Sequence, residues 1–510
     1  MRPVPSIEAM TPQQIMRKRP FLVPVPPDQS VAKPPQIVGA NVSAYTLGKI
    51  EFEVKTQAQF LQEFNVSSHK INALRYYPNT MYMDPASGKY QAKVRSRIAV
   101  GFQNRIYVKR KTALIGNNVG MKILSARADA KKQDMLSRYR EGWEEKNIEI
   151  AIDKAIGADF VTGDAAVYIY LSDKKVGWRT FSYLDGDVLF PHFHPLTGEV
   201  ELLGRLYEAE DWDGNKKRYL DVIDSTSFVT YKESDDQTGW TMEGEPKPHG
   251  FPMCPVAYHR YPFGPVWSAS QGLIDGYEMA ISQFSENNAA YALRILYTLG
   301  ADMEVMTNTD GTPARIDSVD PNAKVGFLEP AAGADGAFVK QLETMEKNIM
   351  RGSFAVETPE IKSGADMSAR TVKMLFADSY LKALDDSQEY QMFLDRVAYL
   401  FRFAYMVETG ESDFNDFKVK TYLEPFIFMS EADVINAIQQ LVAAGVLSKQ
   451  TATEIAYNTG YGTANEWDRI ITEAHDEMVR DASAAKMQAQ AQAQAAPAKP
   501  SNPVNDSRNA

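Results

Sequence analysis

The spacing of apolar positions changes along the chain and divides it into regions. Between about residues 55 and 150, apolar side chains recur at helical spacing, as in "AQFLQEFN" and "KINALRYY". Between about 160 and 262, short runs of aromatic and β-branched residues, such as "AAVYIYL" and "SFVTYK", alternate with turn signals such as "DWDGNK". These patterns predict a helical region followed by a region of antiparallel strands.

Two amphipathic helices with a small β region between them are predicted in the second half of the chain. Residues 268–294 place their apolar side chains near one face, and Ser268 and Gln271 have the spacing of a capping box. The second helix is predicted over 338–356 from the stripe Phe338, Leu342, Met345, Ile349 and Val356. Between them, "DMEVMTNTDGTPARIDSV" has a turn signal at Asp310-Gly311, and "AKVGFLEP" is typical of a strand.

A loop rich in small residues separates these helices from a long one. The loop "ETPEIKSGADMSAR" occupies residues 357–370, and residues 371–409 are predicted to form one helix that ends at Gly410. Its second half, "MFLDRVAYLFRFAYMV", is apolar on nearly every side and is expected to be buried. A strand is predicted in "FKVKTYLEPFIF", and the later helices are expected to be capped by Ser430, Ser448 and the Thr463/Glu466 pair.

Both ends of the chain lack hydrophobic periodicity. Residues 1–44 are rich in proline, as in "PFLVPVPPDQ", and predict an extended or disordered arm. Residues 485–510 contain the repeat "MQAQAQAQAAPAKP" and predict a disordered tail.

Composition limits the classes of function. The chain has 510 residues, 44% of them hydrophobic, which is enough for several domains. Its formal net charge of −11 argues against bulk attraction to nucleic acid. The one cysteine, Cys254, excludes a disulfide framework and is expected to be a buried thiol. No apolar run approaches ~18 residues, so no membrane-spanning helix and no membrane partner are expected.

Two groups of residues suggest chemistry, and neither is strong. A basic run within "VRSRIAVGFQNRIYVKRKTALIG" either contacts phosphates or forms the solvated side of an amphipathic helix, and the second interpretation is favoured. Its cations are Arg95, Arg97, Arg105, Lys109, Arg110 and Lys111. Asp185, Asp187, His192 and His194 include the side chains that bind divalent metals, but "DGD" is also a tight turn and "PHFHP" is also typical of an edge strand. The sequence contains no phosphate-binding G-x-x-x-x-G-K-[ST] motif, and no cofactor is expected.

The order helix, β region, helix, loop, long helix resembles the portal proteins of tailed double-stranded DNA phages, particularly those of long-tailed (siphophage) type. "QGLIDGYEMAISQFSENNAAYAL" is similar to the first stem helix of that family. "LSRYREGWEEKNIEIAIDKAIGADFVTGDAAVYIYL" is similar to its helix, helix, glycine, strand segment in the wing, and "AAGVLSKQTATEIAYNTGY" is similar to its crown segment. The resemblance covers about residues 60–484.

The resemblance implies an α+β fold of portal architecture. Its parts would be a mixed α/β wing (45–262 with 371–428), two stem helices (268–294 and 338–356), a small β clip (295–337), a tunnel loop (357–370) and a helical crown (429–484). It also implies a non-enzymatic ring, a homododecamer in the virion, at one capsid vertex, through which the genome is packaged and ejected. The implied partners are double-stranded DNA, the major capsid protein and scaffold, the terminase large subunit and a head-tail adaptor. Assembly is expected in the host cytoplasm.

The resemblance also assigns candidate sites. The DNA-facing tunnel loop would use Lys362, Ser363, Gly364 and Arg370; the stem would face the channel with Lys340, Lys347 and Arg351; and the clip would dock partners with Thr307, Asn308, Asp310 and Gly311. A channel for a sliding duplex is expected to carry few cations, because each neutralised phosphate strengthens binding. The competing hypothesis is a metal-dependent hydrolase or nuclease that uses Asp185, Asp187, His192 and His194.

Overall fold

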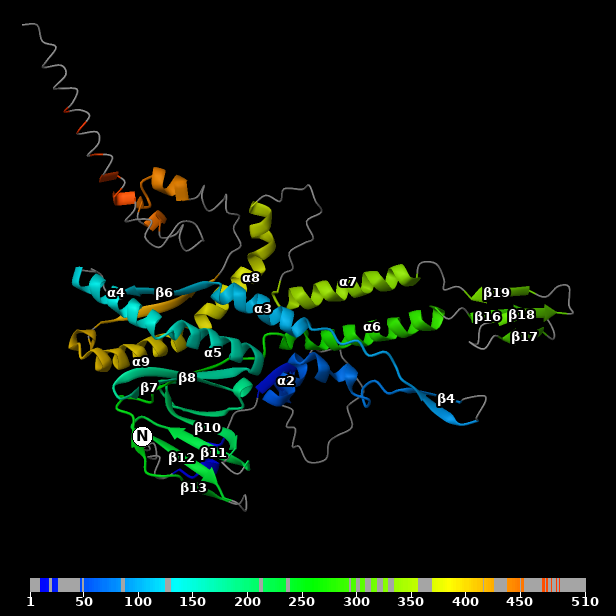
Figure 1. Cartoon of the computed structure of the whole chain (residues 1–510), viewed down its shortest axis with the longest axis horizontal. Coiled ribbons are helices and arrows are strands. Elements are labelled where there is room, and N and C mark those ends of the chain that lie inside the picture. The colour runs from blue at the N-terminus through cyan, green and yellow to red at the C-terminus, as the bar shows by residue number, and fades with distance from the viewer. Residues whose placement is uncertain are drawn as a thin grey trace, which may run out of the picture. The chain divides into compact units, whose positions relative to one another are not determined.

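The computed structural model places most of the chain in two compact units. It describes residues 10–17, 21–25, 46–47, 50–83, 88–123, 130–210, 214–234, 239–292, 295–299, 303–307, 313–318, 324–328, 334–355, 369–415, 417–425, 438–449 and 451–453, and scattered positions between 470 and 486. The first unit contains residues 1–364 and 375–427, and the second contains 365–374 and 428–510. Helices and mostly antiparallel sheets alternate along the chain, which confirms the predicted α+β fold (Figure 1).

The predicted antiparallel region is confirmed. Strands β9 to β13 form a meander in which each strand pairs with the next, and β14 pairs with β12. A second sheet has the order β15-β7-β8. The bounds are β7 (Asp164–Ser172), β8 (Lys175–Ser182), β9 (Val188–Phe193), β10 (Val200–Glu210), β11 (Lys216–Ile223), β12 (Ser227–Glu233), β13 (Trp240–Met242), β14 (Lys247–Pro248) and β15 (Val256–Arg260).

The main apolar core contains helix α5 and parts of the elements around it. Helix α5 (Ile148–Thr162) is buried along most of its length, as its apolar sequence requires. It ends at Gly163, whose φ of +83° is a left-handed conformation that glycine adopts without strain, and β7 begins at the next residue. Helix α4 (Ala130–Glu145) precedes it. The predicted order of two helices, glycine and strand is therefore confirmed.

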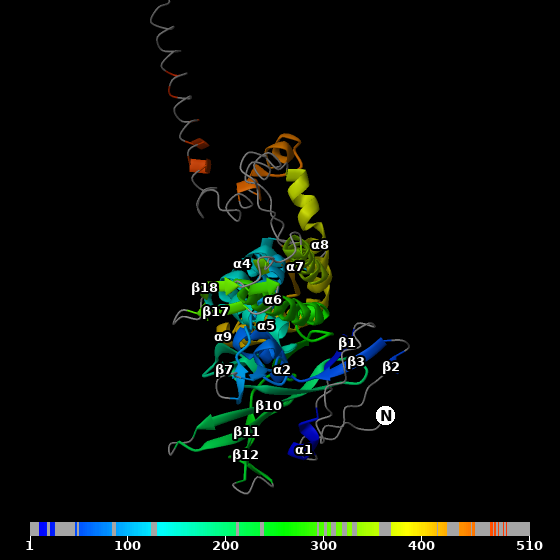
Figure 2. The ribbon, with the colours of Figure 1, turned by 90° about the vertical axis from the view of Figure 1, so that its right-hand side faces the viewer.

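Part of the N-terminal arm is docked on the body of the chain. Helix α1 (Pro12–Ile15) lies beside the β10–β12 sheet (Figure 2). The Ile15 side chain is fully buried there. Strand β1 (Phe21–Val25) pairs antiparallel with β3 (Ile50–Lys55), which also pairs with β2 (Thr46–Leu47). The arm was expected to be extended or disordered. Strand β1 is extended, whereas α1 is helical, and both are held because Ile15 and Phe21 supply apolar side chains that the sheet and Phe60 bury.

The helical prediction for residues 55–150 is only partly right. Helix α2 (Gln57–Phe64) is followed by the hairpin β4 (Thr80–Met83) and β5 (Tyr90–Lys93). Helix α3 (Phe102–Ile115) begins within the basic run, after Arg95 and Arg97. Strand β6 (Asn117–Ile123) pairs with β20 (Val419–Glu424), a partner about 300 residues away that local periodicity cannot reveal.

The predicted long helix is two helices. Helix α8 (Ala369–Glu389) and helix α9 (Gln391–Thr409) are separated at Tyr390. The Tyr390 side chain is 1% exposed, its hydroxyl donates a hydrogen bond to Asp159, and its ring stacks on His259. These buried contacts fix Tyr390 at the point where α8 ends and α9 begins. Helix α9 is buried along one side only, whereas burial on nearly every side was expected; Met392, for example, is 69% exposed. It ends at Gly410 in the left-handed conformation, as predicted.

Two helices and four strands make up the segment 271–352. Helix α6 (Gln271–Ala292) leads into β16 (Ile295–Leu299), β17 (Met303–Thr307), β18 (Pro313–Ser318) and β19 (Lys324–Leu328), and helix α7 (Ala334–Gly352) follows. Strand β16 pairs with β19 and β17 with β18, so the predicted helix, β region, helix order is confirmed. The predicted capping box is not formed, because the Ser268 hydroxyl is buried without a hydrogen-bond partner.

The second unit is described at few positions. The predicted cap at Ser448 is present, since its hydroxyl accepts a hydrogen bond from the Thr451 amide at 3.1 Å. Ser430, the Thr463/Glu466 pair and the end of the chain beyond 486 lie outside the described residues. None of the helices in the described part of the chain combines the length and the apolarity that a membrane crossing needs.

Candidate functional site

Helices α6 and α7 pack against each other along one apolar seam. The rings of Phe284 and Phe338 stack with their centroids 4.6 Å apart. Leu342 and Met345 pack against the main core, and Ile349 is fully buried. Four residues of the predicted stripe therefore lie on the contact face of the pair. The fifth, Val356, lies outside the described residues, and α7 covers Ala334–Gly352 rather than the predicted 338–356.

The opposite face of α7 carries a row of cations. Lys340, Lys347 and Arg351 are separated by seven and four residues, so they project from one side of the helix, about half a turn from the apolar seam. All three are exposed. Within the described part of the chain, none of the three side chains has an ion-pair partner. We call these residues the α7 cation row.

The basic run at 95–111 has the opposite environment. Each of its cations is engaged within the chain, so it does not present a phosphate-contacting face. Lys109 also has an interaction within the structure. The pairs are Arg95 with Glu286 at 2.8 Å, Arg97 with Asn79 at 2.7 Å, Arg105 with Glu346 at 3.1 Å, Arg110 with Asp386 at 2.5 Å and Lys111 with Asp153 at 2.8 Å. The expectation of a solvated face is also incomplete, because these pairs fasten α3 and the segment before it to α5, α6, α7 and α8.

The four candidate metal ligands have structural roles. Burial raises the pKa of Asp187 against the lowering effect of Arg205. Their partners are Ser182 for Asp185 at 2.7 Å, Arg205 for Asp187 at 2.8 Å, the Ile15 carbonyl for His192 at 2.9 Å and the Thr197 amide for His194 at 3.1 Å. Among the residues that the structure describes, no group of three His, Cys, Asp or Glu side chains could hold a metal ion. The hydrolase hypothesis therefore loses its proposed site.

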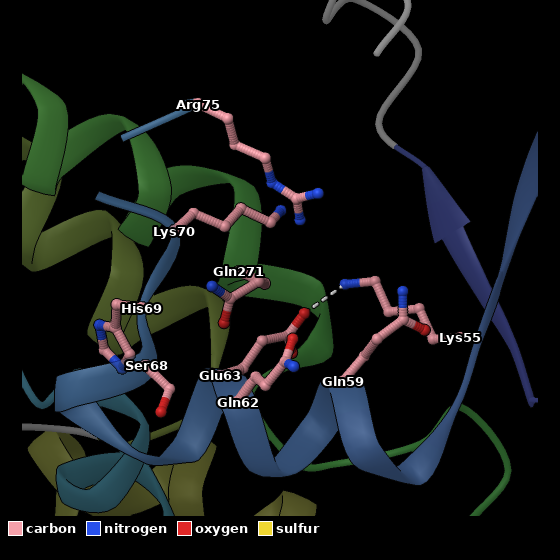
Figure 3. Close-up of a pocket in the computed structure, with 9 residues that line it drawn as sticks. All are labelled: Lys55, Gln59, Gln62, Glu63, Ser68, His69, Lys70, Arg75 and Gln271. Atoms are coloured by element: carbon pink, nitrogen blue, oxygen red, sulfur yellow. Dashed lines mark hydrogen bonds and ion pairs between the residues drawn. The ribbon is translucent and has the colours of Figure 1, made fainter. Parts of the chain in front are cut away.

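Several residues that line a small cavity beside α2 are also engaged in structural contacts. It measures about 120 Å³ and is lined by Lys55, Gln59, Gln62, Glu63, Ser68, His69, Lys70, Arg75 and Gln271 (Figure 3). Lys55 pairs with Glu63 at 2.6 Å, and His69 pairs with Glu278 at 2.6 Å. Lys70 pairs with Asp275 at 2.8 Å. The first pair joins β3 to α2, and the other two fasten the turn after α2 to α6. The thiol of Cys254 is not a candidate for chemistry either, because burial raises its pKa to about 12.

Most of the remaining predicted site residues lie outside the described residues. These are Lys362, Ser363 and Gly364 of the loop, and Asn308, Asp310 and Gly311 of the β region. Arg370 lies in the first turn of α8. Thr307 ends β17, opposite Pro313 of β18. The roles of these residues stay predictions.

Comparison with known proteins identifies a family. The model of the family described as "Phage portal protein, SPP1 Gp6-like" matches residues 65–478. No curated protein sequence matches the chain. Among solved structures, a chain described as "Neck of empty GTA particle computed with C6 symmetry" is similar at 13% sequence identity, over 71% of this chain and 90% of that one, with a TM-score of 0.36. That similarity is too distant to support a conclusion about this chain.

Proposed function

The chain belongs to the SPP1 Gp6-like family of phage portal proteins, and we propose that its copies form a closed ring through which double-stranded DNA enters and leaves a capsid. In this proposal α6 and α7 are the stem, strands β16 to β19 are the clip, and residues 357–370 are the tunnel loop. Residues 45–262 with 371–428 are the wing, and residues 429–484 are the crown.

The observation that carries the proposal is the α7 cation row. One face of α7 is used to pack on α6, while the opposite face presents Lys340, Lys347 and Arg351 without partners among the described residues. Partner-free cations in a chain of net charge −11 are available for phosphate contact. We assign this face to the channel.

A sparse row suits a duplex that must slide. Neutralising six to ten phosphates gives a binding constant that depends steeply on salt, and a ring multiplies the contacts of each subunit by the number of copies. Three cations per subunit, separated along a helix by one or two turns, give repeated weak contacts rather than one tight grip. Lys362 of the loop and Arg370 in the first turn of α8 would add to these contacts.

Two features of the chain support assembly. The hairpin β4–β5 has one apolar face, because the register pairs Met81 with Ala92 and Met83 with Tyr90. All four side chains are exposed. A two-stranded hairpin is at best marginally stable in water, and the two-stranded sheets of the proposed clip have the same limitation. Neighbouring subunits in a ring would cover both, through head-to-tail contacts.

The proposal includes the partners of a portal. The ring would sit at one capsid vertex, contact the major capsid protein and scaffold, and dock the terminase large subunit and then the head-tail adaptor. The clip residues Thr307, Asn308, Asp310 and Gly311 are the proposed docking positions. Because the sequence has no P-loop, ATP hydrolysis is assigned to the terminase.

Native mass spectrometry of the purified chain over a range of salt tests the ring. We expect a closed oligomer, and a stable monomer at micromolar concentration would contradict the proposal. The double variant Met81→Ser/Met83→Ser should weaken the oligomer, since it removes apolar area that a neighbour would bury. The matched control is Met392→Ser, which changes an exposed methionine on α9.

A further inference from the structure

Helix α7 ends in a strained conformation. Phe354 has a φ of +56°, the left-handed region, at a position where helices usually place glycine. The Ala355 amide donates to the Met350 carbonyl at 2.9 Å, which closes the helix end around Phe354. Such a conformation in a bulky residue persists only where the surroundings hold it.

Two other helices hold this end in place. Arg110 of α3 donates from Nη1 to the Ser353 carbonyl at 3.2 Å. Ser379 of α8 donates its hydroxyl hydrogen bond to the Phe354 carbonyl. The Ser353 hydroxyl also donates to Ser270 Oγ at 2.7 Å, at the start of α6. The carbonyls of Ser353 and Phe354, the two residues that follow α7, are thus satisfied from α3 and α8.

Arg110 joins the same cluster to α8 a second time. Its Nη2 donates to Asp386 Oδ2 at 2.5 Å and to the Tyr261 hydroxyl at 2.9 Å, and that hydroxyl donates to Asp386 Oδ1 at 2.9 Å. Arg110, Asp386, Tyr261 and Ser353 are each no more than 7% exposed. A guanidinium reaches two partners on different sides at once, whereas the single ammonium of lysine cannot hold the same fork geometry.

The end of α7 and helix α8 therefore meet at one cluster of hydrogen bonds around Arg110. Ser353 and Phe354 contribute from the end of α7, and Ser379 and Asp386 contribute from α8.

We propose that Arg110 is a positioning residue that locks the end of α7, the helix that carries the α7 cation row, to α8. Its role in DNA passage rests on the proposed portal function, whereas the lock itself does not.

Hydrogen exchange of the assembled protein, measured by mass spectrometry without DNA, tests the lock. Arg110→Lys keeps the buried charge but removes the fork, so amides 349–355 should exchange roughly tenfold faster. The matched control is Arg105→Lys. It alters an exposed contact between α3 and α7, in which Arg105 pairs with Glu346 at 3.1 Å. Exchange of 349–355 in Arg110→Lys equal to that of the wild type would overturn the lock.

A second change separates positioning from general packing. Adding Phe354→Gly to Arg110→Lys should restore slow exchange at 349–355, because glycine adopts the left-handed conformation without needing to be held. Failure of this rescue would overturn the proposed link between Arg110 and Phe354. If Arg110→Lys does not fold, Arg110→Met/Asp386→Leu removes the pair without leaving a buried charge and is measured in the same way.

Complementation of a phage that lacks this gene tests the functional role. Arg110→Lys should reduce the number of DNA-filled heads at least tenfold, while Arg105→Lys should match the wild type. Wild-type numbers of filled heads with Arg110→Lys would overturn the role in DNA passage. Failure of the wild-type gene itself to give filled heads would count against the portal function instead, and the exchange result would still decide the lock.

Discussion

Two regions of this chain each carry several cations but have opposite environments. The run at 95–111 looks like a nucleic-acid contact, but its cations are bound to partners within the chain, and Arg110 is buried. The α7 cation row is shorter and less conspicuous, yet it is exposed and without partners among the described residues. The number of cations in a segment therefore says little about function. Whether cations can contact phosphates depends on whether carboxylates from distant segments already neutralise them.

The largest effect should come from breaking the buried pair of the basic run. Asp386→Ala leaves the Arg110 charge buried and unpaired, which typically costs about 3–5 kcal/mol. The transition of the first unit in differential scanning calorimetry should move to a clearly lower temperature. An unchanged transition would show that the Arg110–Asp386 contact is not a structural one.

A smaller effect is expected at the half-buried pair of Arg95 and Glu286. The hydrogen bond from Arg95 lowers the pKa of Glu286 below 4.5, so the pair stabilises the folded chain above that pH and loses its effect as pH falls through the lowered value. Glu286→Gln should cost up to about 1 kcal/mol at pH 7. The cost should shrink below about pH 4.5, and calorimetry at several pH values checks this. A cost that does not depend on pH would mean that the carboxylate charge is not involved.

The smallest effect on stability should come from the α7 cation row. Exposed substitutions away from special contacts usually change stability by no more than about 0.5 kcal/mol each. Lys340→Gln/Lys347→Gln should therefore leave the calorimetric transition nearly in place. The number of DNA-filled heads in complementation should fall, because these side chains are assigned to phosphate contact. The defect should depend on salt. A large loss of stability would place the row in an interface rather than a channel.

The sequence pattern predicted the elements whose signal is local. The apolar stripe of α7, the order of α4, α5, Gly163 and β7, and the left-handed end of α9 at Gly410 all follow from side chains close together in the chain. The break at Tyr390 was not predictable, because it depends on Asp159 and His259, which come from other elements. The pairing of β6 with β20 was missed for the same reason.

The candidate site also contains residues that local sequence could place and residues that it could not. Helical spacing alone placed Lys340, Lys347 and Arg351 on one face. It could not show that Arg110 is buried, since Asp386, Tyr261 and Ser353 approach it from more than 150 residues away in sequence. The metal hypothesis failed because Asp187 pairs with Arg205 across the sheet, a contact that a short motif does not encode.

Photocrosslinking in DNA-filled heads tests the central claim most directly. A photoreactive amino acid at position 347 replaces a cation of the α7 row, and the control places it at position 108, where Val108 is 52% exposed on α3 in the basic run. We expect crosslinks to DNA from position 347 and none from position 108. Crosslinks to DNA from position 108, or none from position 347, would contradict the assignment of the α7 cation row to the channel.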